Sequence, residues 1–131
     1  MSEQHSAIRL QSALGRVRGY GSARGGTHHW WVQRVTSMAL LPLTLWFILS
    51  VAGHTGATHA EIVLWIGRPL NAVLLLSFIA ISFQHAASGM QVVLEDYVRG
   101  EMKRVMAILV VKALCWILGL LAALSVLRIA I

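Results

Sequence analysis

The sequence predicts an all-α integral membrane protein with three transmembrane helices. Of its 131 residues, 57% are hydrophobic and only 12% are charged, and the apolar residues fall into three long blocks, roughly 32–52, 69–94 and 104–128. A soluble domain of this size needs more charge to cover its surface. About 20 apolar residues in a helix cross a hydrocarbon core of about 30 Å. We therefore expect a basic tail and interfacial segment over 1–31 and a three-helix membrane domain over 32–131.

The N-terminal segment carries much of the positive charge. Four arginines precede the first apolar block: Arg9, Arg16, Arg18 and Arg24. Basic residues at this place orient a membrane protein and contact anionic headgroups. No nucleic-acid partner is expected, because the spans offer no basic groove interleaved with aromatic residues. Glycines between 15 and 26 disfavour the amphipathic helix of a mitochondrial presequence, so we expect a flexible cytoplasmic tail without a cleavable secretory signal.

The two connections differ in charge and predict the orientation. Residues 53–67 contain no Lys or Arg, whereas the second connection carries Arg99 and Lys103. The positive-inside rule places the N-terminus and the second connection in the cytoplasm, and the first connection and the C-terminus outside. Arg128, near the outer end of the third span, can reach the interface by snorkelling.

Prolines and the single cysteine complete the prediction for the spans. Pro69 suits the first turn of the second helix, with Arg68 anchoring that end at the interface. Pro42 lies inside the first span and predicts a kink. Cys115 excludes an internal disulfide and is expected to be a small buried hydrophobe.

A polar stripe runs along the second predicted helix. At about 100° per residue, five residues fall on one narrow face: Asn71, Ser82, His85, Gly89 and Asp96. Lipid does not accept such a face, so it is expected to contact protein or a cofactor, with Phe78 as apolar wall.

His85 is the most informative residue of this stripe, because an ionisable group at membrane depth is costly and usually functional. Three roles stay open: a cofactor ligand, a partner in helix packing, and a proton relay. In the sharpest hypothesis His85 is an axial ligand to haem iron, and Gly89 leaves room for the porphyrin. No other histidine reaches this depth, so a second histidine ligand has to come from another polypeptide.

Asp96 and Tyr97 lie about 16 to 18 Å beyond His85 along the helix, at the predicted cytoplasmic boundary. A carboxylate and a phenol at this place suit proton-coupled chemistry on a lipid-soluble quinone. The alternative is an interfacial tyrosine beside a solvated acid.

Two motifs in this order resemble the succinate dehydrogenase hydrophobic membrane anchor family: His85-Ala86-Ala87-Ser88-Gly89-Met90, and Asp96-Tyr97-Val98. The segments 12–16, 28–34 and 65–67 are also similar to that family, so the resemblance covers most of the chain. It implies that His85 ligates a haem b shared with a second membrane subunit, close to Gly89. It also implies that Tyr97 hydrogen-bonds ubiquinone, with Asp96 as a neighbouring contributor.

The same resemblance implies that Arg34 and His28 interact with the haem propionates. A glycine-rich insertion between 16 and 28 leaves His29 as an alternative to His28. A guanidinium suits this role because it can hold a carboxylate bidentately.

The resemblance implies a membrane anchor of succinate:ubiquinone oxidoreductase, respiratory complex II, which links the tricarboxylic acid cycle to electron transport. Its partners would be a second three-helix cytochrome b subunit, supplying the other haem ligand, and iron–sulfur and flavoprotein subunits docked on the cytoplasmic face. The chain would not be catalytic alone, and it would lie in a bacterial inner membrane rather than a mitochondrial one. Two alternatives stay open: the anchor of a fumarate reductase, and a haem-free transport or assembly subunit in which His85 and Asp96 form a proton path.

Overall fold

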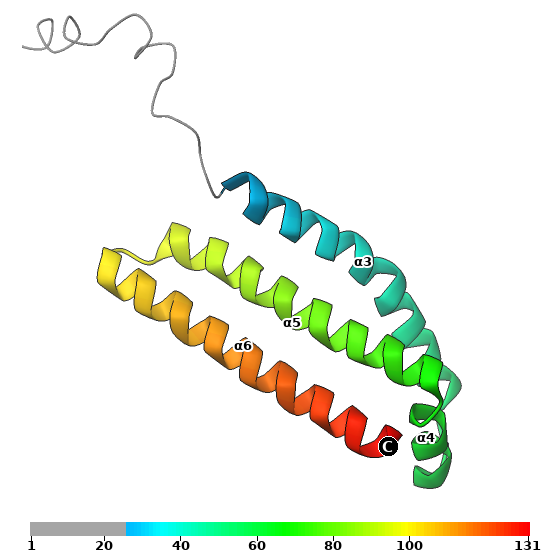
Figure 1. Ribbon diagram of the computed structural model, residues 1–131. Coiled ribbons are helices and arrows are strands. Elements are labelled where there is room, and N and C mark those ends of the chain that lie inside the picture. Colours follow the sequence, from blue (N-terminus) through cyan, green and yellow to red (C-terminus); the bar gives the residue numbers. More distant parts are fainter. Residues whose placement is uncertain (1–25) are drawn as a thin grey trace, which may run out of the picture.

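Four α-helices make up the part of the chain that the structure, a computed structural model, describes, which is residues 26–131. They are α3 (Gly26–Gly53), α4 (His59–Ile66), α5 (Pro69–Tyr97) and α6 (Glu101–Ala130). Figure 1 shows the three long helices side by side, with α5 in the middle and the short α4 at one end. Helix α5 contacts both α3 and α6. The predictions for the basic tail and for segment 12–16 lie outside the described residues.

The three long helices confirm the predicted spans. The most apolar 18-residue windows of α3, α5 and α6 have mean hydropathies of 1.9, 1.6 and 2.5. Each helix is longer than its apolar block, because it continues through polar residues that hydropathy does not count. Helix α3, with 28 residues, rises about 42 Å. It already begins at Gly26, so Trp30 and Trp31 lie within its first turns rather than in a separate interfacial segment.

Both prolines stand where the sequence predicted them. Pro69 opens α5, and Arg68 before it is extended, with φ −67° and ψ 128°, as the residue preceding a proline prefers. Pro42 lies inside α3, which is visibly curved in Figure 1. A proline has no N–H for the carbonyl one turn earlier, which is a common cause of helix bending.

Helix α4 lies within residues 53–67, for which the sequence predicts a connection and no helix. Thr58 starts it through a capping box: the Thr58 N–H donates to Glu61 Oε2 at 2.7 Å, and the Glu61 N–H donates to Thr58 Oγ1 at 3.4 Å. The Thr58 N–H, helped by its hydroxyl, lowers the pKa of the exposed Glu61 carboxyl. Helix α4 packs against α5 and α6, and its Trp65 ring stacks on Trp46 of α3, with ring centroids 5.8 Å apart.

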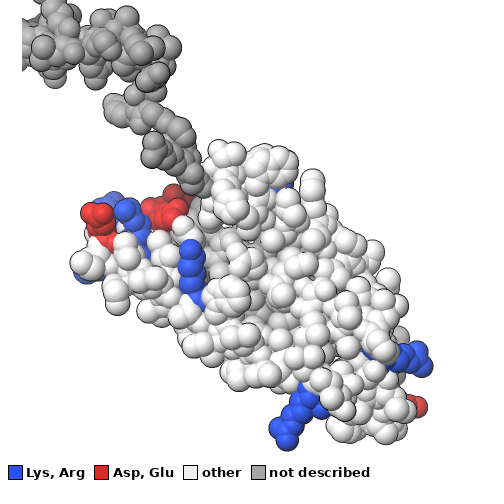
Figure 2. Space-filling view, viewed as in Figure 1, with Lys and Arg blue, Asp and Glu red and all other residues white. Residues whose placement is uncertain are grey.

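Very little of the described chain is buried inside the chain itself. Four residues are buried, all on α5: Ala72, Leu75, Ala87 and Ser88. Large apolar side chains point outward instead, as Leu41 does with 74% of its surface exposed. Figure 2 shows the charged side chains gathered mainly toward the two ends of the molecule, with a broad uncharged surface between them. This distribution fits a surface that lipid and neighbouring subunits cover.

Candidate functional site

His85 lies where α5 packs against α3, opposite Thr36. Its ring nitrogen Nδ1 is 2.9 Å from Thr36 Oγ1, and both residues are half-buried. The same hydroxyl lies 2.7 Å from the Val32 carbonyl oxygen and 3.1 Å from the Gln33 carbonyl oxygen. The second ring nitrogen, Nε2, makes no hydrogen bond within residues 26–131. His85 is thus fixed through one nitrogen and keeps the other for a partner.

Gly89 lies one turn beyond His85, and Gln33 of α3 fills the space beside it. A Cβ atom placed on Gly89 would come within 3.3 Å of Gln33 Nε2. This contact gives the helix-packing interpretation a specific partner, since small residues allow side chains of a neighbouring helix to approach closely. The porphyrin-facing role of Gly89 stays a prediction.

Two polar atoms at the same seam are buried and unpaired in the described part of the chain. They are His29 Nε2 and Gln33 Oε1. His29, Gln33 and Thr36 are spaced four and three residues apart, so they share one face of α3. Buried polar atoms in proteins nearly always have a hydrogen-bond partner. The two atoms differ in what they can bind: His29 Nε2 can pair with a carboxylate when it carries a hydrogen, whereas the Gln33 oxygen can only accept and needs a donor.

The two histidines at the start of α3 differ in position. His28 is exposed, whereas His29 is half-buried and holds one of the unpaired atoms. Of the two histidines that the sequence left as alternatives, His29 faces the seam. Arg34 is exposed, and its guanidinium carbon lies 5.2 Å from the centroid of the Trp30 ring.

Two further residues on this side of α5 also meet protein. Phe78 stacks on Phe47 of α3, with centroids 4.8 Å apart, and the Asn71 side chain donates to the carbonyl of Trp65 in α4 at 2.7 Å. The predicted stripe therefore meets α3 near His85 and Phe78 and meets α4 at Asn71.

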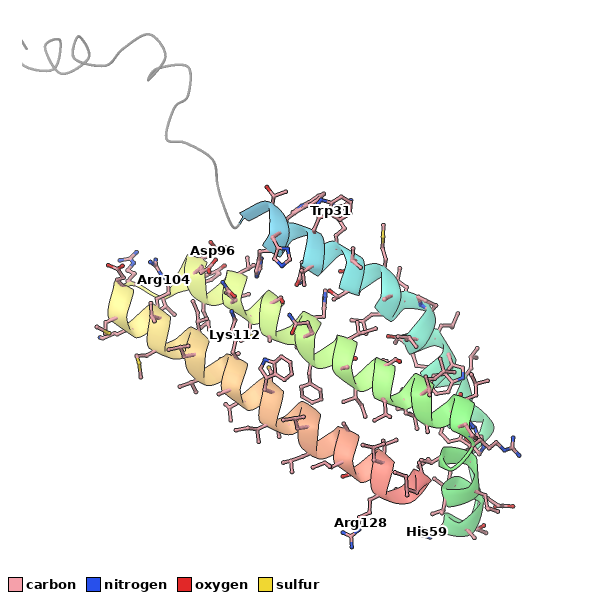
Figure 3. The ribbon with its side chains drawn as sticks, in the orientation of Figure 1. Trp31, His59, Asp96, Arg104, Lys112 and Arg128 are labelled. Atoms are coloured by element: carbon pink, nitrogen blue, oxygen red, sulfur yellow. The ribbon has the colours of Figure 1, made fainter. Side chains whose placement is uncertain are left out.

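Asp96 and Tyr97 form a separate group at the end of α5. Both are exposed, Tyr97 with 82% of its surface. Figure 3 shows Asp96 at the same end of the bundle as Trp31 and Arg104, away from Arg128 and His59. The structure does not bring Asp96 or Tyr97 next to His85. Both are exposed in the described part of the chain, where another subunit or a ligand can reach them.

Three residues of interest were missed by the sequence interpretation. Thr36 and Gln33 lie inside the predicted first span, but their contacts with α5 depend on how α3 packs, which no spacing within one helix indicates. Lys112 is the third, a half-buried lysine within α6, which Figure 3 shows between α6 and α5 in the half nearer Arg104. A lone lysine in an apolar block was its signal. Cys115 is a half-buried free cysteine, somewhat more exposed than the small buried hydrophobe that the sequence predicts.

The fold and the site define a multi-pass helical membrane subunit with a histidine at a helix seam. The sequence matches the succinate dehydrogenase/fumarate reductase transmembrane subunit family over residues 8–120, and the chain belongs to this family.

Curated relatives give the same assignment in more detail. A succinate dehydrogenase hydrophobic membrane anchor subunit from Rickettsia conorii is 37% identical over 107 residues, which cover 81% of this chain and 85% of the relative. The corresponding subunit from Paracoccus denitrificans is 31% identical, covering 67% of this chain and 68% of the relative. A membrane anchor subunit from Reclinomonas americana is 31% identical, covering 70% and 78%. No solved structure gives a significant match. The chain is a membrane anchor subunit of the succinate dehydrogenase type.

Proposed function

We propose that this chain, with a second membrane subunit, holds haem b and forms part of a ubiquinone site in a succinate:ubiquinone oxidoreductase. The observation that carries the proposal is His85, which is bonded through Nδ1 to Thr36 and keeps Nε2 unbonded within the described residues. A histidine iron ligand has this arrangement, with one nitrogen on the metal and the other oriented by a hydrogen bond.

His85 would supply one axial ligand through Nε2, and the partner subunit would supply the other. When bound, the haem supplies a one-electron store beside the quinone. The unpaired Nε2 of His29 suits a propionate as hydrogen-bond partner, and His29 takes this role more readily than the exposed His28. Arg34, one turn further along α3, can add a charge-assisted bond by leaving Trp30.

Tyr97 would bind the quinone at the cytoplasmic end of α5. Its exposed hydroxyl can donate a hydrogen bond to a quinone carbonyl, and Asp96 beside it can pass on protons. Tyr97 and the haem ligand lie on one helix about 18 Å apart. One rigid element thus sets the spacing between the two sites.

The surroundings of the chain follow from its charge and its relatives. We place the N-terminus and the connection after α5 in the cytoplasm, because that connection carries Arg99 and Lys103. Iron–sulfur and flavoprotein subunits would dock on this face, near Tyr97. The relatives in Rickettsia and Paracoccus favour a bacterial inner membrane.

The decisive experiment is the reduced-minus-oxidised spectrum of a His85→Ala variant in the purified, assembled complex. We expect the low-spin b-type bands to be lost or strongly altered, because iron loses a ligand. His54→Ala is the matched control: His54 lies at the outer end, where Nδ1 pairs with the Ser50 carbonyl at 2.7 Å, and its spectrum should match wild type. Unchanged bands in assembled His85→Ala would reject His85 as the ligand. A colourless wild-type complex that moves protons would support the haem-free alternative.

A further inference from the structure

Thr36 has three close polar neighbours but only one hydroxyl proton. Its oxygen lies 2.7 Å from the Val32 carbonyl oxygen, 3.1 Å from the Gln33 carbonyl oxygen and 2.9 Å from His85 Nδ1. Carbonyl oxygens can only accept hydrogen bonds. If the proton pointed at His85, both carbonyls would face the hydroxyl oxygen at close range with no hydrogen between them. The proton therefore goes to a carbonyl, and Val32 offers the shorter contact.

The tautomer of His85 follows from this proton count. Because the Thr36 hydroxyl donates its proton to a backbone carbonyl, its oxygen can only accept a hydrogen bond from the imidazole. Nδ1 therefore carries the hydrogen. In a neutral imidazole one nitrogen is a donor and the other an acceptor. Nε2 therefore has its lone pair free, which is the form that binds a metal.

We propose that Thr36 is the positioning residue for His85: it holds the ring as the Nδ1–H tautomer and directs Nε2 toward the haem iron. This inference rests on the proposed haem function and adds the residue that prepares the ligand. Thr36 suits the task because its side chain is stiff at χ1 and its bond to the preceding turn of α3 fixes the hydroxyl. An α3 side chain thus orients a ligand carried by α5.

The kind of acceptor also sets the electronic character of the ligand. A carboxylate in place of Thr36 would accept a charge-assisted hydrogen bond from Nδ1–H, whereas a hydroxyl oxygen accepts a weaker one that still increases electron donation from Nε2 to iron. Removing the acceptor makes His85 a weaker electron donor. Ferric iron, the more electron-poor state, then loses more stabilisation than ferrous iron, so the midpoint potential rises.

The test compares Thr36→Val, Thr36→Ala and Thr36→Ser in the purified complex. Val keeps the shape of Thr but has no hydroxyl. Ala lacks both the hydroxyl and the methyl group, and Ser keeps the hydroxyl but lacks the methyl group. Ser37→Ala is the matched control, because Ser37 makes the same kind of bond to its own helix, 2.7 Å to the Gln33 carbonyl, and has no contact with His85. The readouts are haem content, haem transfer to an excess of apomyoglobin, the low-spin EPR signal and the midpoint potential.

We expect Val and Ala to retain haem about 10–100-fold less tightly, as loss of an orienting partner usually does. Haem that remains should have a shifted EPR signal and a more positive potential. Ser should restore all readouts, and Ser37→Ala should equal wild type. If Val fails to assemble, the comparison of Ala with Ser decides.

Two results overturn the inference, and both differ from failure of the proposed function. Wild-type potential, EPR signal and haem retention in both Val and Ala would remove Thr36 from the haem site. Ser and Ala variants that are equally defective beside a wild-type Val variant would mean that the methyl group, not the hydroxyl, matters. In both cases His85→Ala still loses the haem bands, whereas intact bands in His85→Ala would reject the proposed function itself.

Discussion

Gly119→Ala should loosen the packing of α6 against α5. A Cβ atom on Gly119 would lie 3.2 Å from Phe83 Cγ, 3.3 Å from Cδ2 and 3.4 Å from Cβ. These neighbours belong to the base of an aromatic ring, which cannot move aside as the end of a flexible chain can. Overpacking costs about 1–3 kcal/mol, and alanine returns up to about 1 kcal/mol through its higher helix propensity. We expect the packing of α6 against α5 to lose about 1 kcal/mol of stability, which raises the equilibrium constant for separation of the two helices roughly fivefold.

Cys115 provides the assay for this change, since it lines the same α5–α6 groove as Gly119 and Phe83. A fluorescent maleimide added to the detergent-solubilised complex labels this single cysteine, and gel electrophoresis separates the chain from its partners. Labelling should be several-fold faster in Gly119→Ala than in wild type. Gly53→Ala is the control, because no atom lies within 4 Å of a Cβ at Gly53.

The ring contact can be tested directly by adding Phe83→Leu to Gly119→Ala. If the clash is the cause, the double variant should label more slowly than the sum of the single effects predicts. Additive effects, or a Gly119→Ala rate no higher than that of Gly53→Ala, would refute the reasoning.

Three further predictions concern the two ends of the bundle. Tyr97→Phe should lower quinone reduction by roughly 3-fold to 10-fold, the worth of one hydrogen bond, while haem content and succinate oxidation by a soluble acceptor stay normal; wild-type quinone turnover would reduce Tyr97 to an interfacial anchor. In a Cys115→Ser background, an impermeant thiol reagent should label Thr58→Cys but not Arg99→Cys in intact cells, and the reverse pattern would contradict the orientation. The folded-state pKa of Glu61 is lowered, so its contribution to α4 is present above the ordinary carboxyl pKa and is lost as the pH falls through the folded value. Amide exchange in α4 should accordingly accelerate on acidification in wild type, relative to other helices, but not in Glu61→Gln; equal acceleration in both would show that another group is responsible.

The number of spans could be predicted from sequence because hydrophobic length is a property of each segment by itself. Helix ends were less certain, since α3 continues to Gly26 through polar residues that hydropathy does not count. Helix α4 is short and lies among Gly, Thr and His residues that favour a connection, so only the capping-box spacing of Thr58 and Glu61 indicates it.

Only the part of the candidate site that lies on α5 could be predicted from the sequence. The polar stripe of α5 identified His85, since its spacing lies within one helix. Its contact with Thr36 depends on how two helices pack, and no spacing along the chain contains that information. Gln33 illustrates the same limit: its approach to Gly89 depends on the rotation of α3, which is set by packing.

The scarcity of buried residues has a consequence for how much of this protein a cell can hold. Ala72, Leu75, Ala87 and Ser88 are the only described residues that the chain itself encloses, so folding alone secures few contacts. Lipid can cover the apolar flanks of an unassembled copy, but such a copy lacks most of the protein contacts that would hold its helices in one arrangement. A loosely packed subunit opens locally more often, and proteases cleave the open form. The abundance of the chain should therefore follow the supply of its partners rather than its own rate of synthesis.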